Sequence, residues 1–186
     1  LNELQYKGVV VIKSTIVPDY LHEFKKAFEL KMVYNPGFLT EANAAHDFAN
    51  PKMQVLGGKW KDCEVVEKAY LRYSSVKIVP TFKTDLTTAS LLKYTINSYL
   101  ASKVMFMNDI YKLHQAGSSS VSWDQFTDML ERDPRIGDSH MKVPGPDGEF
   151  GFGGHCFPKD TEALLKYAKD KNIKLNMLKK AVEINN

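Results

Sequence analysis

Short apolar runs alternate with amphipathic segments over the first half of the chain. Residues 8–15 (GVVVIKST) are mostly β-branched and predict a strand buried on both faces, which is typical of a parallel sheet. The same patterns predict further strands at 32–35, 54–57 and 77–79, and helices at 20–30 and 62–73. Strands that alternate with helices predict the α/β class.

A long helix is predicted next, over residues 84–115. Apolar residues recur there in steps of three to six residues: Leu86, Leu92, Ile96, Leu100, Val104, Met107 and Tyr111. Such a helix spans roughly 45 Å, too much for one small core, so it either bridges two lobes or pairs with a second subunit. The alternative is two helices with a break near Ser102.

Helices and one long loop fill the remainder of the chain. Ser122 is the predicted N-cap of a helix that runs to about Glu131. Three prolines and six glycines between residues 134 and 154 predict a loop. A helix beginning at Lys159 or Thr161 and a final one from about Leu175 follow. The predicted domains are residues 1–83, with the sheet, and residues 84–186, mostly helical.

Composition excludes several classes of protein. Charged residues make up 25% of the chain and the net charge is only +3, which gives no support for nucleic-acid binding. No apolar run reaches the ~18 residues of a membrane helix, and no signal peptide is visible. The two cysteines make no disulfide framework, which predicts a reducing, cytoplasmic setting. No metal site is predicted.

Residues 151–160 (GFGGHCFPKD) bring together more candidate catalytic groups than any other segment of the chain. Cys156 follows a glycine-rich turn and precedes Lys159 and Asp160. A thiol beside backbone amides, a cation and a carboxylate could attack a carbonyl carbon, hold the oxyanion and later hydrolyse a thioester. The alternative is a structural cysteine buried behind a glycine turn.

This ten-residue string resembles the catalytic cysteine loop of the UDP-glucose/GDP-mannose dehydrogenase family. The resemblance implies that Cys156 is the nucleophile, and that Lys159 supplies positive charge and contacts the cofactor. It implies that Asp160 orients the hydrolytic water together with Thr15. It also implies a sugar pocket lined by Phe152, Gly153 and Phe157.

Two segments near the first strands extend the resemblance. Lys13-Ser14-Thr15 resembles the end of the family's cofactor domain, which implies cofactor contacts for Ser14 and Thr15; the alternative is hydroxyls that cap a turn. Residues 35–41 (NPGFLTE) resemble NPEFLxE, a substrate-lining segment, and Phe38, Leu39 and Glu41 match it. Gly37 stands where the family has a general-base glutamate, so hydrolysis of the thioester is the step this departure affects.

The helical half carries the remaining matches. Lys93 and Asn97 lie four residues apart and share a helix face, and the resemblance assigns them to oxyanion stabilisation; the alternative is ordinary surface. In DPRIG, Arg135 is implied to reach the active site of the neighbouring subunit, and Lys142 to lie near the nucleotide sugar. His155 is predicted to be a bystander.

Together these matches imply a Rossmann-like cofactor domain joined to a helical dimerisation domain. The implied activity is NAD-dependent oxidation of UDP-glucose to UDP-glucuronate in two hydride transfers, by a homodimer or higher homo-oligomer. The alternatives are a relative acting on UDP-N-acetylhexosamine or GDP-mannose, and a truncated, non-catalytic dimerisation module. The chain starts at Leu1 and holds no GxGxxG, which predicts the middle half of a longer family member.

Overall fold

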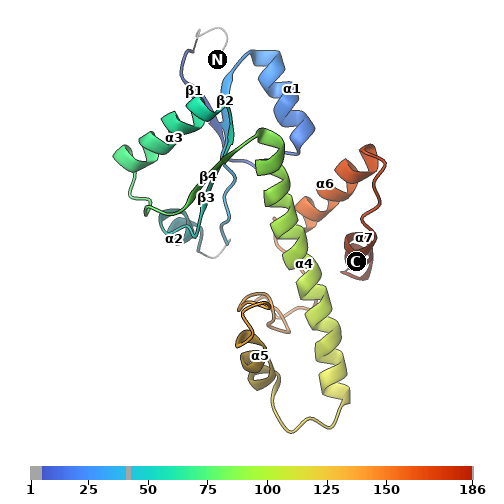
Figure 1. Ribbon diagram of the computed structural model, residues 1–186. Coiled ribbons are helices and arrows are strands. Elements are labelled where there is room, and N and C mark those ends of the chain that lie inside the picture. Colours follow the sequence, from blue (N-terminus) through green and yellow to red (C-terminus); the bar gives the residue numbers. More distant parts are fainter. Residues whose placement is uncertain (1–5, 41–42, 186) are drawn as a thin grey trace. The chain divides into compact units, whose positions relative to one another are not determined.

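The chain forms two compact units, Leu1–Tyr94 and Thr95–Asn186, which divide inside one long helix. A computed structural model describes residues 6–40 and 43–185 (Figure 1). The predicted domain boundary, after residue 83, lies eleven residues before this division and stays a prediction. In the described ranges no helix has both the length and the apolar character needed to cross a membrane.

The first unit is built on a four-stranded sheet of order β1-β2-β3-β4. Its strands are Val9–Ile12, Lys31–Tyr34, Gln54–Gly58 and Thr81–Thr84. The pairs β1-β2 and β3-β4 are parallel, which confirms the α/β class, but β2 and β3 are antiparallel. In the described part of their connection the only helix is the six-residue α2 (Ala44–Ala49). That helix is too short for a crossover, so the chain turns back instead.

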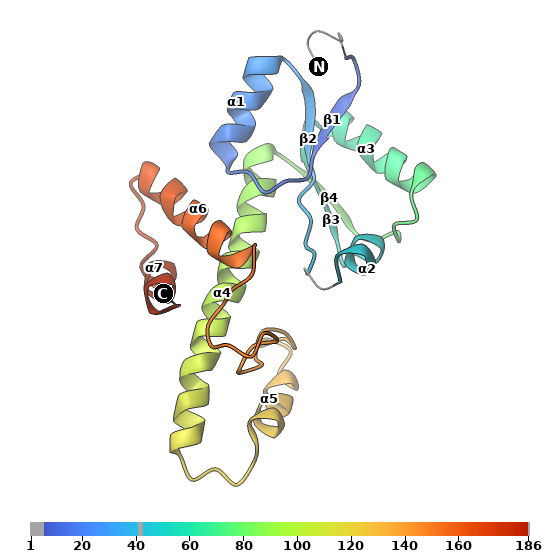
Figure 2. The same ribbon diagram turned by 180° about the vertical axis from the view of Figure 1, so that it is seen from behind.

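Helices cover both faces of this sheet (Figures 1 and 2). On one face, α3 (Trp60–Tyr73) packs Cys63 and Val66 against Val33 and Leu56 of the strands. On the other face lie α1 (Pro18–Phe28) and the start of α4 (Leu86–Ala116). The cluster on that face comprises Leu21, Met32, Tyr34, Val55, Leu86 and Ala89. Successive residues of β2 thus point to opposite helices, as strand geometry requires.

A glycine lets the sheet touch the first turn of α4. A Cβ on Gly57 would lie 2.5 Å from the Cβ of Ala89 and 2.8 Å from the carbonyl oxygen of Asp85. Asp85 also starts the helix, because its carboxylate accepts hydrogen bonds from the Thr88 amide (2.8 Å) and hydroxyl (2.7 Å).

Two local predictions in this unit are wrong. Residues 77–79 form no strand: the ladder partners of β3 are residues 81–84, and the apolar side chain of Ile78 is 86% exposed. Burial and pairing, not β-branched content, decide where the strand lies. The short helix α2 was not predicted. None of its residues is buried, so residues 44–49 lack the periodic apolar positions by which an amphipathic helix is recognised in a sequence.

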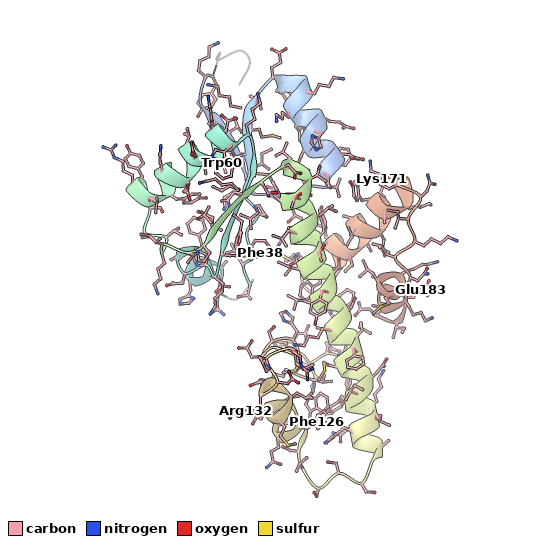
Figure 3. The ribbon with its side chains drawn as sticks, viewed as in Figure 1. Phe38, Trp60, Phe126, Arg132, Lys171 and Glu183 are labelled. Carbon is pink, nitrogen blue, oxygen red and sulfur yellow. The ribbon has the colours of Figure 1, made fainter. Side chains whose placement is uncertain are left out.

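The second unit packs three helices on the C-terminal part of α4. Its helices are α5 (Trp123–Glu131), α6 (Phe157–Asp170) and α7 (Asn176–Asn185). One cluster contains Ala101, Met105, Phe152 and Ala181; the other contains Met107, Trp123, Met141 and Val143. Phe126, labelled in Figure 3, extends the second cluster, with its ring centroid 5.4 Å from that of Trp123.

The helix boundaries follow local chemistry. α4 is unbroken at Ser102, whose hydroxyl donates to the Ser98 carbonyl (2.9 Å), so the alternative of two helices is excluded. Ser122 is the N-cap of α5, as predicted, and forms a capping box with Gln125. α6 begins at Phe157, earlier than predicted, because Pro158 suits the first turn of a helix.

Candidate active site

Cys156 stands exposed in front of helix α6. It occupies the N-cap position, and Gly151 and Gly154 precede it with φ angles of +82° and +71°. Free backbone N–H groups at a helix start stabilise nearby negative charge. The alternative of a buried structural cysteine does not hold for Cys156, whereas Cys63 is buried and its thiol donates to the Leu56 carbonyl.

One helical turn after the cysteine lies a buried carboxylate. Asp160 is 1% exposed. Its Oδ2 accepts a hydrogen bond of 2.6 Å from the Asn97 amide, and its Oδ1 lies 2.5 Å from the Lys159 ammonium. The Lys159 side chain is 56% exposed, so its charge reaches solvent while it partners the carboxylate. A buried charge held by a cation and an amide is fixed in orientation, which suits a group that must position a reactant.

Two asparagines that sequence reasoning missed hold the cysteine loop. The Gly151 amide donates to Asn108 Oδ1 (2.9 Å), and the Phe152 amide donates to Asn185 Oδ1 (2.7 Å). Asn185 also donates to the Phe152 carbonyl (3.1 Å). The sequence does contain a signal that points to Asn108. It follows Asn97 by eleven residues, about three helical turns, so both side chains lie on one face of α4.

The aromatic residues of the loop have different surroundings. Phe152 is 7% exposed and belongs to the core cluster with Ala101 and Met105. Its ring meets that of the half-buried Phe157 edge-on, with centroids 6.3 Å apart. Gly153, between Phe152 and the cysteine, is exposed. The two rings thus pack beneath the cysteine loop and hold it against the core of the second unit.

The predicted arginine is presented on the surface of the second unit. The Arg135 guanidinium forms a fork with Asp133, at 2.9 and 2.5 Å, and the side chain is 87% exposed. Hydrogen bonds from Arg135 lower the pKa of Asp133, and the same pairing raises the pKa of Arg135. Lys142, the other predicted cation here, is also exposed.

The first unit carries the predicted cofactor residues. Ser14 and Thr15 follow the carboxyl end of β1, the edge of a parallel sheet where ligands bind. Neither hydroxyl hydrogen-bonds to any residue that the structure describes, so the alternative of turn-capping hydroxyls is not realised. Free hydroxyls at this edge fit the ribose and amide groups of a dinucleotide.

A second feature of this edge was not predicted. The Lys13 ammonium donates to Asn35 Oδ1 (2.8 Å), which also accepts from the Tyr70 hydroxyl (2.8 Å). The Asn35 amide in turn donates to the Val55 carbonyl (2.8 Å). Burial lowers the pKa of Lys13 and raises that of Tyr70. This network ties the segment after β1 to the segment after β2.

The segment of the first unit that is predicted to line the substrate is partly described. Phe38 is half-buried, and the Lys93 ammonium lies 5.6 Å from its ring centroid (Phe38 is labelled in Figure 3). Lys93 is 6% exposed, so the alternative of ordinary surface is wrong for it, as it is for Asn97, also at 6%. Leu39 is 38% exposed, and Glu41 lies outside the described residues.

Three histidines lie at the surface or against aromatic rings. His155 and His46 are exposed, and His46 pairs with Asp47 at 3.5 Å. His114 lies against the rings of Trp123 and Phe126, at centroid distances of 5.6 and 5.4 Å.

The fold and site together define the class: an α/β unit with two hydroxyls after the carboxyl end of β1, joined to a helical unit with an exposed cysteine. Residues 87–186 match the model of the UDP-glucose/GDP-mannose dehydrogenase family, central domain. Residues 1–74 match the model of the same family's NAD binding domain. The chain belongs to the UDP-glucose/GDP-mannose dehydrogenase family, and NAD is the cofactor of the domain type that its first part represents.

Curated relatives agree with this family. The chain is 33% identical over 186 residues to UDP-glucose 6-dehydrogenase TuaD of Bacillus subtilis, with 95% of this chain and 38% of that protein covered. It is 33% identical over 183 residues to UDP-glucose 6-dehydrogenase of Rickettsia conorii, with 95% and 40% covered. The chain therefore spans about two fifths of the length of these relatives.

Solved structures share the fold. A UDP-glucose dehydrogenase from Pyrobaculum islandicum superposes with a TM-score of 0.77 at 28% identity, over 95% of this chain and 40% of that one. A UDP-D-ManNAc dehydrogenase from Pyrococcus horikoshii gives 0.75 at 25% identity, over 95% and 41%. These similarities confirm the Rossmann-type class of the first unit.

Proposed function

We propose that the native protein oxidises UDP-glucose to UDP-glucuronate with NAD, through a covalent intermediate on Cys156. The observation that carries this proposal is the exposed Cys156 thiol one helical turn before Asp160, a buried carboxylate held by Asn97 and Lys159. Both curated relatives described above are named UDP-glucose 6-dehydrogenases. The product, a nucleotide-sugar acid, would serve polysaccharide biosynthesis.

The thiol performs the covalent chemistry. Once the sugar's primary alcohol has become an aldehyde, the sulfur of Cys156 bonds to the aldehyde carbon. The carbonyl oxygen becomes the oxyanion of a thiohemiacetal, and the thiol proton is released. Lys93 and Asn97 stabilise this oxyanion, because donors aimed at developing charge are the strongest electrostatic contribution to catalysis. Loss of hydride from the same carbon gives a thioester.

Hydrolysis completes the reaction. Asp160, fixed by its buried hydrogen bond, and Thr15 orient a water molecule that attacks the thioester carbon. The carbon–sulfur bond breaks, the carboxylate leaves and Cys156 recovers its proton. NAD, when bound, accepts one hydride in each of the two oxidation steps. Ser14, Thr15 and Lys159 are proposed to contact it.

Substrate binding is assigned to both units. We propose that Phe38, Leu39 and Glu41 line the diphosphate and sugar on the first unit. The corresponding residues of the second unit are Lys142, Phe152, Gly153 and Phe157, and Arg135 of the neighbouring subunit completes the set. The names of the solved relatives include a UDP-D-ManNAc dehydrogenase, and the family is named also for GDP-mannose, so the competing substrates are UDP-N-acetylhexosamines and GDP-mannose.

A stripe on α4 supports the proposed homodimer. Tyr99, Phe106 and Leu113 are 60%, 63% and 69% exposed and follow one another at seven-residue steps. Residues at this spacing form a single seam along a helix, as in paired helices. We propose that this seam pairs two subunits, and that the protein resides in the cytoplasm, where Cys156 stays reduced.

The decisive experiment measures NADH formation by the native protein with a panel of nucleotide sugars. UDP-glucose should be the best substrate, and Cys156→Ala should abolish turnover while the control Cys63→Ala keeps it. Acid quenching during turnover should reveal an adduct on the Cys156 peptide that hydroxylamine removes, as expected of a thioester. Full turnover by Cys156→Ala would overturn the mechanism.

Other outcomes with the same panel of nucleotide sugars would favour one of the alternative functions. Preference for a UDP-N-acetylhexosamine or GDP-mannose would reassign the substrate within the family. No NADH with any nucleotide sugar would favour a non-catalytic dimerisation module, an alternative that Gly37 motivates.

A further inference from the structure

Lys103, on the C-terminal part of α4, forms hydrogen bonds with three backbone carbonyl groups of one loop. Its ammonium donates to the carbonyl oxygens of Ile136 (3.1 Å), Gly137 (3.4 Å) and Ser139 (2.5 Å). An ammonium has three N–H donors, and here all three serve residues that directly follow Arg135.

The loop needs such a partner because its backbone is unusual. Gly137 and His140 have φ angles of +74° and +62°, in the left-handed region that residues other than glycine rarely adopt. The carbonyl oxygens of Ile136, Gly137 and Ser139 converge on one ammonium in this loop. Like-oriented carbonyl dipoles repel one another, so their convergence is stable only around a cation or donors.

The charge of Lys103 has no close ion-pair partner among the described residues. Lys103 forms no ion pair with any described residue, although Asp138 and Glu131 lie near enough to raise its pKa. Burial is the larger effect and lowers that pKa. The loop carbonyls are therefore the groups that solvate this ammonium, which suits a role in fixing the loop.

The same loop reaches the cysteine segment. The His140 ring lies against the Phe157 ring, with centroids 5.4 Å apart, and Phe157 directly follows Cys156. At its other end the loop carries Arg135, whose guanidinium is oriented by Asp133. One lysine thus anchors the backbone between an exposed guanidinium and the residue after the nucleophile.

We propose that Lys103 is a positioning residue, which holds residues 135–140 in the conformation from which Arg135 meets the anionic diphosphate of the nucleotide sugar. This inference rests on the proposed function only for the identity of that ligand. The anchoring of the loop is a property of the chain itself and has its own measurement.

The first measurement is cleavage by an arginine-specific protease under native conditions. In Lys103→Met the bond after Arg135 should be cut about tenfold faster than in the wild type, since the lost charge-assisted hydrogen bonds let the loop open. Cleavage after Arg72, at the end of α3, is the internal reference and should not change. The matched control is Lys112→Met, which removes an exposed lysine of the same helix whose one ion pair among the described residues is with Asp109.

The second measurement is steady-state kinetics of the native protein. Lys103→Met should raise the KM for the nucleotide sugar about tenfold with a smaller change in kcat, because it weakens a binding contact. A merely structural role would instead lower kcat in proportion to the folded fraction and leave KM unchanged. If Lys103→Met does not fold, Gly137→Ala disturbs the same loop without altering α4 and should give the same two effects.

The two measurements separate failure of this inference from failure of the proposed function. An unchanged rate of cleavage after Arg135 in both loop variants would overturn the anchoring. Faster cleavage with an unchanged KM would overturn the positioning of Arg135. Absence of any nucleotide-sugar oxidation in the wild type would refute the function, while the cleavage result would still decide the anchoring.

Discussion

The Asn97 amide donates a hydrogen bond of 2.6 Å to the Asp160 carboxylate, and both side chains are buried, at 6% and 1% exposure. The pair joins α4 to the first turn of α6, the turn that begins next to Cys156. Sixty-three residues separate the partners in sequence. This contact orients the carboxylate in addition to the local backbone, in which the Asp160 amide donates to the Cys156 carbonyl (2.9 Å).

Replacing the carboxylate should impair the reaction rather than the fold. Asp160→Asn keeps the shape but removes the charge that partners Lys159 and that we propose to position water. We expect turnover of the native protein to fall by about 10²–10⁴-fold, the usual contribution of a positioned acid–base group. Quenched-flow measurement of adduct decay should locate the defect in thioester hydrolysis. The control Asp170→Asn, at the exposed end of α6, should be close to wild type.

Restoring the carboxylate absent at position 37 should accelerate that same step. Gly37 has no positive φ, and the nearest atom to an added Cβ is Leu39 Cγ at 3.3 Å, which belongs to an exposed side chain that can shift. Gly37→Glu should therefore fold and shorten the lifetime of the Cys156 adduct, by about tenfold or more if the carboxylate acts as a base. Gly37→Gln supplies the matched control. An equal effect of both substitutions would show that charge is not the cause.

Gly151 should tolerate no side chain. Its φ is +82°, and an added Cβ would lie 2.4 Å from Asn185 Oδ1, the atom that accepts the Phe152 amide. We expect Gly151→Ala to reduce the free energy of unfolding by about 1–3 kcal/mol. Urea denaturation provides the measurement. Gly117→Ala is the control, since the nearest atom to a Cβ added there is the Leu113 carbonyl oxygen at 3.5 Å. An equal loss of unfolding free energy in Gly117→Ala would show that the crowding at Gly151 is not the cause.

His140 should make stability depend on pH. Burial, and secondly the charge of Lys103, lower the pKa of His140 below its ordinary value of 6.5. The unfolded chain therefore binds the proton more readily than the folded one, so the free energy of unfolding should fall as the pH drops below about 6.5. Asn tolerates the left-handed backbone at this position, so His140→Asn should remain folded.

Comparing the wild type with His140→Asn isolates the contribution of His140 to the pH dependence of stability. Urea midpoints measured between pH 5 and 7 should decline toward acid less steeply for His140→Asn than for the wild type, because other titrating groups are common to both. Parallel declines would mean that His140 titrates normally in the folded protein.

The sequence predicted the elements whose signal is local. The β-branched run at β1, the apolar spacing of α4 and the Ser122 cap each depend on neighbours within a few residues, and the strand, the helix and the cap are confirmed. The predicted burial of β1 on both faces is wrong, since Val11 is 38% exposed and no residue of the strand is fully buried. The cysteine loop was recognisable because its chemistry is contiguous: one decapeptide contains the thiol, the cation and the carboxylate. Family membership followed from that string.

Only the tertiary structure decided features that depend on distant partners. The antiparallel pairing of β2 with β3, the strand at residues 81–84 and the burial of Lys93 result from what packs against each segment, which no local pattern encodes. The loop asparagines Asn108 and Asn185 and the anchoring lysine Lys103 have the same origin. Each satisfies backbone groups more than thirty residues away, since buried polar groups require partners wherever the fold brings them.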